Sequence, residues 1–166
     1  MATRAEAASQ PPGSDIAGTR GPNSVGAGTG LATAEIEVRS GPPNALWRYV
    51  PTLRNEDDHW RLRIVAHDFG MVWEETDLAQ RLSLVETEPA PFDQRWDAFL
   101  AAYVEHRCSE DGLVPPPWVM QPERHLRTFW HPCGCPDWDL VRSIVTTPGA
   151  FELHGIWLPR DELLVV

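Results

Sequence analysis

Residues 95–106, with the sequence RWDAFLAAYVEH, constrain the fold of this chain more than any other stretch. Their large apolar side chains follow the i, i+3, i+4, i+7 and i+8 spacing of one buried helix face: Trp96, Phe99, Leu100, Tyr103 and Val104. Asp93 is suited to cap the start of this helix, and Gly112 follows its polar end. The pattern predicts a helix at the core of a folded module.

Composition divides the chain into a tail and a domain. Residues 1–30 are rich in Ala, Gly, Ser, Pro and Thr, with almost no large apolar side chains, so they cannot bury enough surface to offset the entropy of ordering. We therefore expect a disordered tail over residues 1–40 and a single domain over residues 44–166. The expected class of this domain is mainly α with long Pro-rich loops, or α+β if one or two short strands form.

Four further helices are predicted beside the one at residues 95–106. The first runs over 55–75, with Asn55 as its N-cap and a weak point at Gly70, and the second over 78–86 with Leu78, Leu82 and Val85 facing inward. The third follows Asp137 and ends before Pro148, and the fourth covers 149–154 with Gly155 just beyond its end. Residues 33–38, 46–53 and 156–158 are expected to be extended, and the prolines of 115–118 to adopt polyproline II.

The charge of the chain bears on its partners. The formal net charge is −10, and all 14 basic residues are arginine. Because a negative surface repels phosphate, direct nucleic-acid binding is disfavoured unless arginines gather on one face. No apolar run resembles a secretory signal or approaches the roughly 20 residues of a membrane span. We expect a cytoplasmic protein that binds no membrane and no cofactor.

One loop concentrates residues that can ligate metal. His131, Cys133 and Cys135 are the ligand types that zinc prefers, and His125 or Cys108 offers a fourth ligand. Structural zinc sites, however, separate their cysteines by two to four residues, and here a single residue intervenes. The alternative is that both cysteines are small apolar residues of a loop. A zinc-stabilised module therefore stays open as an alternative function.

The sequence contains no recognisable catalytic constellation. His59 and His67 lie near several acids but without a zinc-protease motif, and GAGTG at residues 26–30 lacks the lysine and following helix of a phosphate-binding loop. We therefore expect a protein that is not an enzyme. Trp and Arg are enriched at interaction hot spots. The predicted partner-binding residues are Trp118, Trp130, Arg124 and Arg127, with Trp118 as an exposed anchor on the Pro-rich segment.

The second half of the chain resembles a known module. RWDAFLAAYVEH, PPPWV, PERHLRTFWHP and TTPGAFELHGIWLPRDEL follow one another between residues 92 and 166. This order is similar to the C-terminal module of small actinobacterial antitoxin-like proteins, which carry a helix like RWDALLAALAEH, a P-x-W turn, PERFLxxxW and an ending like SPAAFRRRGIFI. The matching positions are Trp96, Trp118, Trp130, Phe151 and Ile156. With the helix before it, the resemblance covers about two-thirds of the chain.

The resemblance implies that this chain is a component of a toxin–antitoxin system. Such a component has a cognate protein partner, which in that family is a toxin. Many such proteins carry an N-terminal helix-turn-helix, which residues 1–40 lack, and the basic FRRRG is replaced here by FELHG at residues 151–155. These departures weigh against DNA binding, so a transcriptional regulator is kept only as an alternative. The resulting hypothesis is a non-enzymatic, antitoxin-like or accessory protein that binds a partner through an acidic, Trp-bearing surface.

Overall fold

The computed structural model describes residues 41–132 and 137–164. The chain divides into two units, Met1–Ile36 and Glu37–Val166, and every described residue belongs to the second unit. This unit is mainly helical, as predicted, and its described residues form no sheet. The predicted tail over 1–40 and the predicted strand over 33–38 lie outside the described residues.

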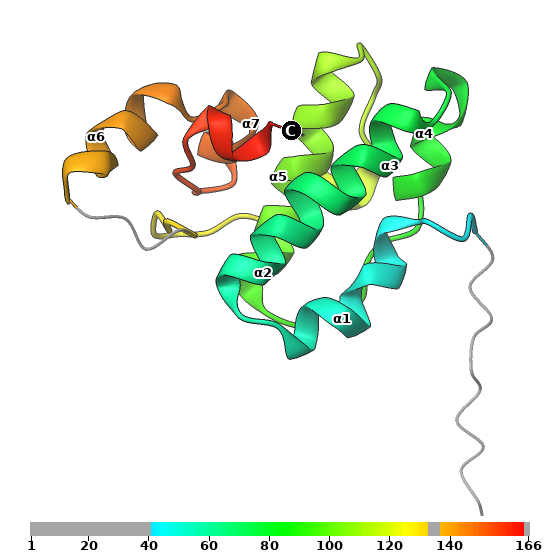
Figure 1. Cartoon of the computed structure of the whole chain (residues 1–166), viewed down its shortest axis with the longest axis horizontal. Coiled ribbons are helices and arrows are strands. Elements are labelled where there is room, and N and C mark those ends of the chain that lie inside the picture. The colour runs from blue at the N-terminus through cyan, green and yellow to red at the C-terminus, as the bar shows by residue number, and fades with distance from the viewer. Residues whose placement is uncertain (1–40, 133–136, 165–166) are drawn as a thin grey trace, which may run out of the picture. The chain divides into compact units, whose positions relative to one another are not determined.

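Seven α-helices follow one another along the described chain (Figure 1). Their bounds are α1 Val50–Asn55, α2 Asp58–Arg63, α3 Gly70–Glu75, α4 Leu78–Val85, α5 Gln94–Glu110, α6 Asp137–Thr146 and α7 Gly149–Leu153. The described chain also contains four short 3₁₀ turns: η1 Leu46–Tyr49 before α1, η3 Pro117–Met120 and η4 Pro122–Arg124 between α5 and α6, and η5 Arg160–Leu163 after α7. A π-helical stretch, η2 Ile64–Phe69, connects α2 to α3.

The predicted helix over residues 55–75 is present, with a different start and a different irregularity. Asp57 is the N-cap, since its side chain accepts a hydrogen bond from the backbone N–H of Trp60, and Asn55 instead ends α1. From Asp58 onward α2, η2 and α3 form one continuous rod (Figure 1). Gly70 keeps helical angles, so the predicted weak point is a π-helical segment that ends one residue before it.

The expectation that residues 46–53 are extended is wrong. They form η1 and the first turn of α1, and Pro51 occupies one of the first two positions of that helix. A proline is favourable there because the first helical N–H groups have no intrahelical acceptor. Pro117 likewise starts η3, which shortens the predicted polyproline stretch before Trp118. In both places a proline begins a helical turn.

Helix α5 lies at the centre of the core, as the spacing of its apolar residues predicts. Trp96, Phe99 and Tyr103 are completely buried, and Asp93 caps the helix by accepting hydrogen bonds from the backbone N–H groups of residues 95 and 96. Phe69 of η2 packs edge-to-face on Tyr103, with ring centroids 6.2 Å apart. The rod formed by α2, η2 and α3 therefore covers one side of α5, and α7 packs on the same helix.

Several helices keep apolar side chains on the surface, and α4 and α6 have more than one each. On α4, Leu84 and Val85 are buried, whereas Leu78 and Leu82 are exposed, contrary to the prediction that both face inward. On α6, Val141 and Val145 are 66% and 76% exposed. The apolar periodicity of these segments locates the helices correctly, but it does not say which apolar residues have a neighbour to pack against.

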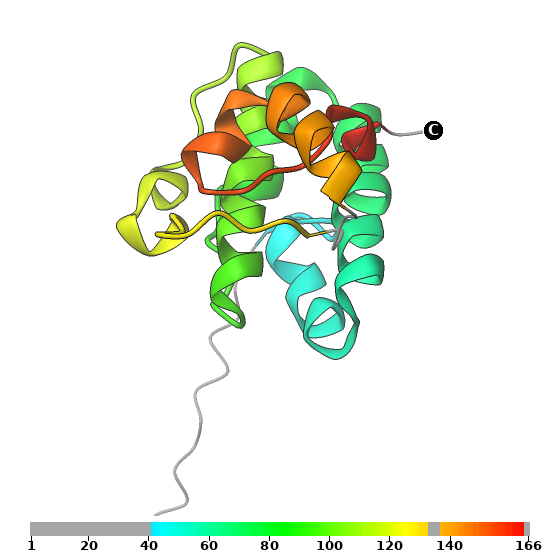
Figure 2. The same cartoon turned by 90° about the vertical axis from the view of Figure 1, so that its left-hand side faces the viewer.

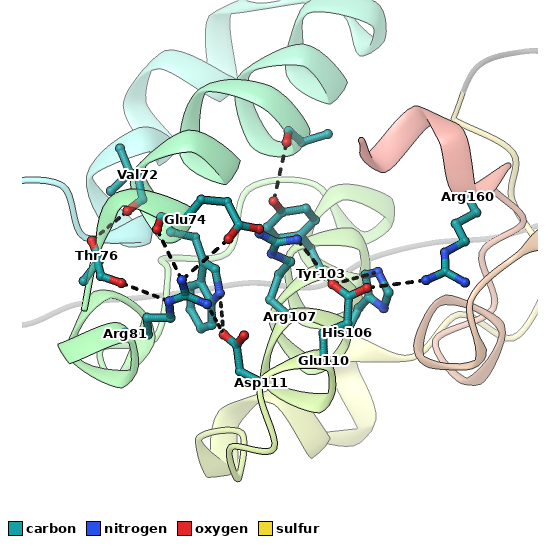
Figure 3. A network of polar contacts seen from close by, with 12 residues as sticks. Val72, Glu74, Thr76, Arg81, Tyr103, His106, Arg107, Glu110, Asp111 and Arg160 are labelled. Atoms are coloured by element: carbon teal, nitrogen blue, oxygen red, sulfur yellow. Dashed lines mark hydrogen bonds and ion pairs between the residues drawn. The ribbon is translucent and has the colours of Figure 1, made fainter. Parts of the chain in front are cut away.

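A polar network ties the C-terminal end of α5 to α3 and α4 (Figure 3). Asp111 accepts hydrogen bonds from the indole N–H of Trp73, at 2.8 Å, and from Arg81, at 2.6 Å. Arg107 binds the carboxylates of Glu74 and Glu110. We call these residues, with Thr76, His106 and Arg160 drawn beside them, the C-terminal network of α5. Its cations are neutralised within the fold, so its role is to hold these helices together.

Candidate functional site

Two chain segments build the candidate site at the other end of α5. Residues 126–130 run alongside residues 154–157, and Figure 2 shows the first of these segments, in yellow, crossing α5. The backbone N–H of Leu126 donates to the carbonyl of His154 at 3.0 Å, and that of Trp130 donates to the carbonyl of Gly155 at 3.0 Å. The predicted strand at 156–158 is thereby reduced to one isolated parallel bridge, between Trp130 and Ile156.

Gly155 makes the close approach of these segments possible. Its φ is +78°, in the left-handed region, and it directly follows the residue that caps α7, as the sequence predicts. A Cβ at this position would lie 2.8 Å from the carbonyl oxygen of Leu126. Glycine is therefore required here both for the backbone angle and for the contact between segments, and only the first requirement is visible in the sequence.

A buried histidine pins the same segment to α5. His154 is completely buried, its Nδ1 lies 2.6 Å from the carbonyl oxygen of Arg124, and its Nε2 lies 2.9 Å from a carboxylate oxygen of Glu105. His125 stacks on its ring, with centroids 4.2 Å apart. Burial is the main cause that lowers the pKa of His154, and the neighbouring His125 lowers it further. The position of His154 is thus structural, and it fixes the start of the segment that carries Arg127 and Trp130.

Two of the four predicted partner-binding residues are buried. Trp118 is only 4% exposed, and its indole N–H donates to the carbonyl of Val85 at 2.8 Å, so the expectation of an exposed anchor is wrong. Arg124 is 3% exposed, lies over the ring of Trp118 and binds a carboxylate oxygen of Glu88 at 2.6 Å. Both side chains are buried and have their polar partners inside the fold, so they offer no surface to a partner protein in this conformation.

The other two predicted residues, Arg127 and Trp130, meet in one groove. The groove has a volume of about 400 Å³, and we call it the aromatic–arginine groove. Its lining residues are Gln94, Arg95, Leu126, Arg127, Thr128, Phe129 and Trp130. The prediction from sequence omits Arg95 and Phe129. Phe129 carries a signal, because it lies between Arg127 and Trp130, whereas Arg95 is separated from them by more than 30 residues and reaches the groove only through the fold.

The aromatic rings of the groove are held in place from behind. Trp130 packs edge-to-face on the buried Trp96, with ring centroids 5.3 Å apart, and the guanidinium of Arg95 lies 5.2 Å from its centroid. Phe129 is 48% exposed and stacks on Trp157 at 4.5 Å. A rigid aromatic ring offers contact area at a low cost in side-chain entropy. The groove therefore presents pre-arranged rings of the kind found at interaction hot spots.

The charge of the groove differs from that of the chain. Its charged side chains are Arg95 and Arg127, and none of the described residues that line it carries a carboxylate. Arg127 is exposed and makes no ion pair with any residue in the described ranges. The nearest carboxylate to Arg95 belongs to Asp93, with Nε and Oδ1 3.8 Å apart. The surface around Trp130 is therefore locally basic, whereas the predicted partner-binding surface was acidic and Trp-bearing; where a partner binds stays a prediction.

A second, larger cleft of about 640 Å³ contains both histidines of the first predicted helix. Asp57, His59, His67 and Glu162 contribute to its lining. Within residues 41–132 and 137–164, no group of three or more His, Cys, Asp or Glu side chains is placed to hold a metal ion. This cleft is therefore not a candidate metal centre formed by the described residues.

The cysteines divide between described and undescribed parts of the chain. Burial raises the pKa of the Cys108 thiol to about 11, so Cys108 is not an activated nucleophile at neutral pH. Cys133 and Cys135 lie outside the described residues, while His131 has its Nε2 2.8 Å from the hydroxyl of Ser143. Zinc binding by His131, Cys133 and Cys135 stays a prediction, and elemental analysis of protein purified without chelator tests it.

Comparisons with protein-family models, curated proteins and solved structures found no match to this chain. The resemblance to antitoxin-like proteins therefore stays a hypothesis. Within the described ranges, no helix combines the length and the apolar character that crossing a membrane requires. The described residues form a small, mainly helical unit that carries a locally basic, aromatic groove on its surface.

Proposed function

We propose that this chain is a non-enzymatic binding protein, of the antitoxin-like or accessory kind, that recognises a cognate protein through the aromatic–arginine groove. One observation carries the proposal: Arg127, Phe129 and Trp130, on the segment that pairs with residues 154–157, meet Arg95 of α5 in one groove. Exposed arginine and aromatic side chains on a rigid frame are the composition of interaction hot spots.

The structure favours this groove over the other predicted partner-binding positions. Trp118 and Arg124 lie inside the fold, whereas Phe129 and Arg127 reach the surface. The buried Arg124 ends η4, only three residues before Arg127. The carbonyl oxygen of Arg124 lies 2.6 Å from Nδ1 of His154, which anchors the segment that leads to the groove. Arg124 and Trp118 therefore support the groove, and Arg127 and Phe129 make contact with the partner.

Site-specific photo-crosslinking tests the proposal. A photoreactive phenylalanine analogue replaces Phe129 in the groove or, as the control, Val114, which is 82% exposed in the loop after α5. Irradiation in the source organism is expected to attach one and the same protein to position 129 and none to position 114. A chain that shows no adduct from position 129, or the same adducts from both positions, contradicts the proposal.

A further inference from the structure

We propose that the aromatic–arginine groove takes an acidic segment of the partner protein, in which an Asp or Glu side chain binds Arg127 and a neighbouring apolar side chain packs on Leu126 and Phe129. This inference rests on the proposed function, because it names the chemistry of the partner at the same groove. It specifies more, since a protein-binding groove of this size also accommodates neutral or basic segments.

Unneutralised positive charge is the first argument. Arg127 has no ion-pair partner within the described ranges, and Asp93, the carboxylate nearest to Arg95, already accepts hydrogen bonds from the backbone N–H groups of residues 95 and 96. An arginine binds a carboxylate through two parallel hydrogen bonds, which makes the pair both strong and directional. Arg127, with the half-exposed Arg95 beside it, is therefore complementary to an anionic side chain.

The contrast with the remaining surface provides selectivity. The chain has a formal net charge of −10, so an acidic segment is repelled by most of its surface and attracted at the groove. An acidic segment is thus attracted to the groove and repelled by the acidic parts of the surface. A basic segment would bind better at other parts of the surface than beside Arg95 and Arg127.

The apolar walls of the groove are the reason for expecting an apolar side chain next to the acidic one in the partner segment. Phe129 stacks on Trp157 and is 48% exposed, and Leu126 is half-buried beside it. A volume of about 400 Å³ lies within the ~300–1,000 Å³ range of small ligand sites, so the groove holds one or two side chains of a short segment. An apolar residue next to the acidic one covers Phe129 while the carboxylate remains at Arg127.

Nucleic acid is the competing ligand, because aromatic and arginine side chains also stack on bases and bind phosphate. A single strand, however, needs a positively charged track along its backbone. Here the positive charge is confined to two arginines on a chain of net charge −10, so most of a strand would be repelled. The observations therefore favour an acidic peptide.

Titration of the full chain with defined probes tests the inference. The probes are a blocked hexapeptide Ala-Leu-Asp-Glu-Leu-Ala, its neutral counterpart Ala-Leu-Asn-Gln-Leu-Ala and a single strand of ten thymidines. Binding is followed by NMR at the indole N–H groups. The acidic peptide is expected to bind about tenfold more tightly than the neutral one, which corresponds to about 1.4 kcal/mol, and to weaken as salt is added.

Matched variants locate the effect. Arg127→Gln is expected to remove the preference for the acidic peptide, and Arg127→Lys to restore part of it, because a lysine keeps the charge without the paired hydrogen bonds. Arg63→Gln makes the same change of charge at an exposed arginine of α2 outside the groove, and is expected to leave binding unchanged. Circular dichroism of each variant verifies that it is folded.

Three outcomes overturn the inference: equal or absent binding of the acidic and neutral peptides, an equal loss in Arg127→Gln and Arg63→Gln, or tighter binding of the thymidine strand than of the acidic peptide. These outcomes are separable from failure of the proposed function. A partner crosslinked at position 129 without any acidic preference preserves the function and rejects the inference. A preference for the acidic peptide without any protein crosslinked at position 129 preserves the inferred chemistry of the groove and rejects the proposed function.

Discussion

The two ends of helix α5 both carry arginines, but these arginines have opposite surroundings. At the C-terminal end, the Arg107 side chain is 11% exposed and binds two carboxylates (Figure 3). At the N-terminal end, the Arg95 side chain is 50% exposed, and Arg127 has no ion-pair partner within the described ranges. The difference separates charge that stabilises the fold from charge that remains for a partner.

The aromatic residues beside them differ in the same way. Trp73, in the C-terminal network, is 1% exposed and has its indole N–H bonded to Asp111. Phe129, in the groove, remains half exposed although a stack with Trp157 holds it. An aromatic ring that is fixed in place but half exposed contributes little to the stability of the isolated chain. The comparison therefore predicts large effects on stability at one end of α5 and effects on binding at the other.

The largest effect on stability is expected from Asp111→Ala, which removes the acceptor shared by Trp73 and Arg81. Loss of a partly buried ion pair together with an indole hydrogen bond should lower the free energy of unfolding by about 3 kcal/mol. Urea unfolding measures this change. Glu75→Ala, at an exposed acid of α3, should remain within about 0.5 kcal/mol of the parent. Equal effects of the two changes would show that the network does not stabilise the fold.

Gly155→Ala should come next, with a loss of about 2 kcal/mol, because it places a side chain at positive φ and against the Leu126 carbonyl. It should also displace residues 126–130 and change the near-ultraviolet dichroism of the groove tryptophans. The matched control is Gly149→Ala, where an added Cβ meets no atom within 4 Å. If both glycine variants unfold at the same denaturant concentration, the backbone pairing does not depend on Gly155.

A smaller effect is expected from acid, through His106 on α5 and through His154, which contacts Glu105 of the same helix. Burial lowers the pKa of His106 and of His154 below the ordinary histidine value. The unfolded chain therefore binds more protons just below pH 6.5, so stability is complete above that pH and is lost as the pH falls through the lower folded-state values. Urea unfolding between about pH 7.5 and about pH 5 measures the loss.

Variants assign this loss to the two histidines. His154→Gln should remove the part that belongs to the segment behind the groove, near Glu105 and His125, and His106→Gln the part beside Glu110 and Arg107. A pH profile that neither variant alters would reject the assignment to these two histidines.

The smallest effect on stability is expected from Arg127→Ala. Because this exposed side chain makes no ion pair within the described ranges, its removal should change the free energy of unfolding by no more than about 0.5 kcal/mol. The same variant should lose the protein that crosslinks at position 129. A marked loss of stability would mean that Arg127 serves the fold as Arg107 does, and the contrast between the two ends would disappear.

Helix positions were predictable wherever local signals agree. The cap at Asp93, the apolar spacing of Trp96 to Val104 and the glycine after α7 are contained in short stretches of chain, and each has the predicted place in the structure. Predictions of exposure were less reliable, as Trp118 is buried and Leu78 exposed. Exposure depends on what the remaining chain places against a residue, and no local pattern contains that information.

The groove shows the same limit. Arg127, Phe129 and Trp130 are close in sequence, and the frequency of arginine and tryptophan at interaction sites was sufficient to single out two of them. The same reasoning selected Arg124 and Trp118, because composition alone does not distinguish an arginine paired with Glu88 from one that has no such partner. Arg95 was not found, since the contact between α5 and the segment after η4 brings it to the groove.

The sequence by itself determined a mainly helical unit built around α5, because caps and apolar spacing act over a few residues. Only the tertiary structure decided which of its arginines and tryptophans are buried and which are exposed. Long-range contacts bury Arg124 and Trp118 behind the groove and bring Arg95 beside Arg127 and Phe129 in front. The physical reason is that burial and ion pairing are properties of neighbours in space, and most of the neighbours that matter here lie 30 or more residues apart along the chain.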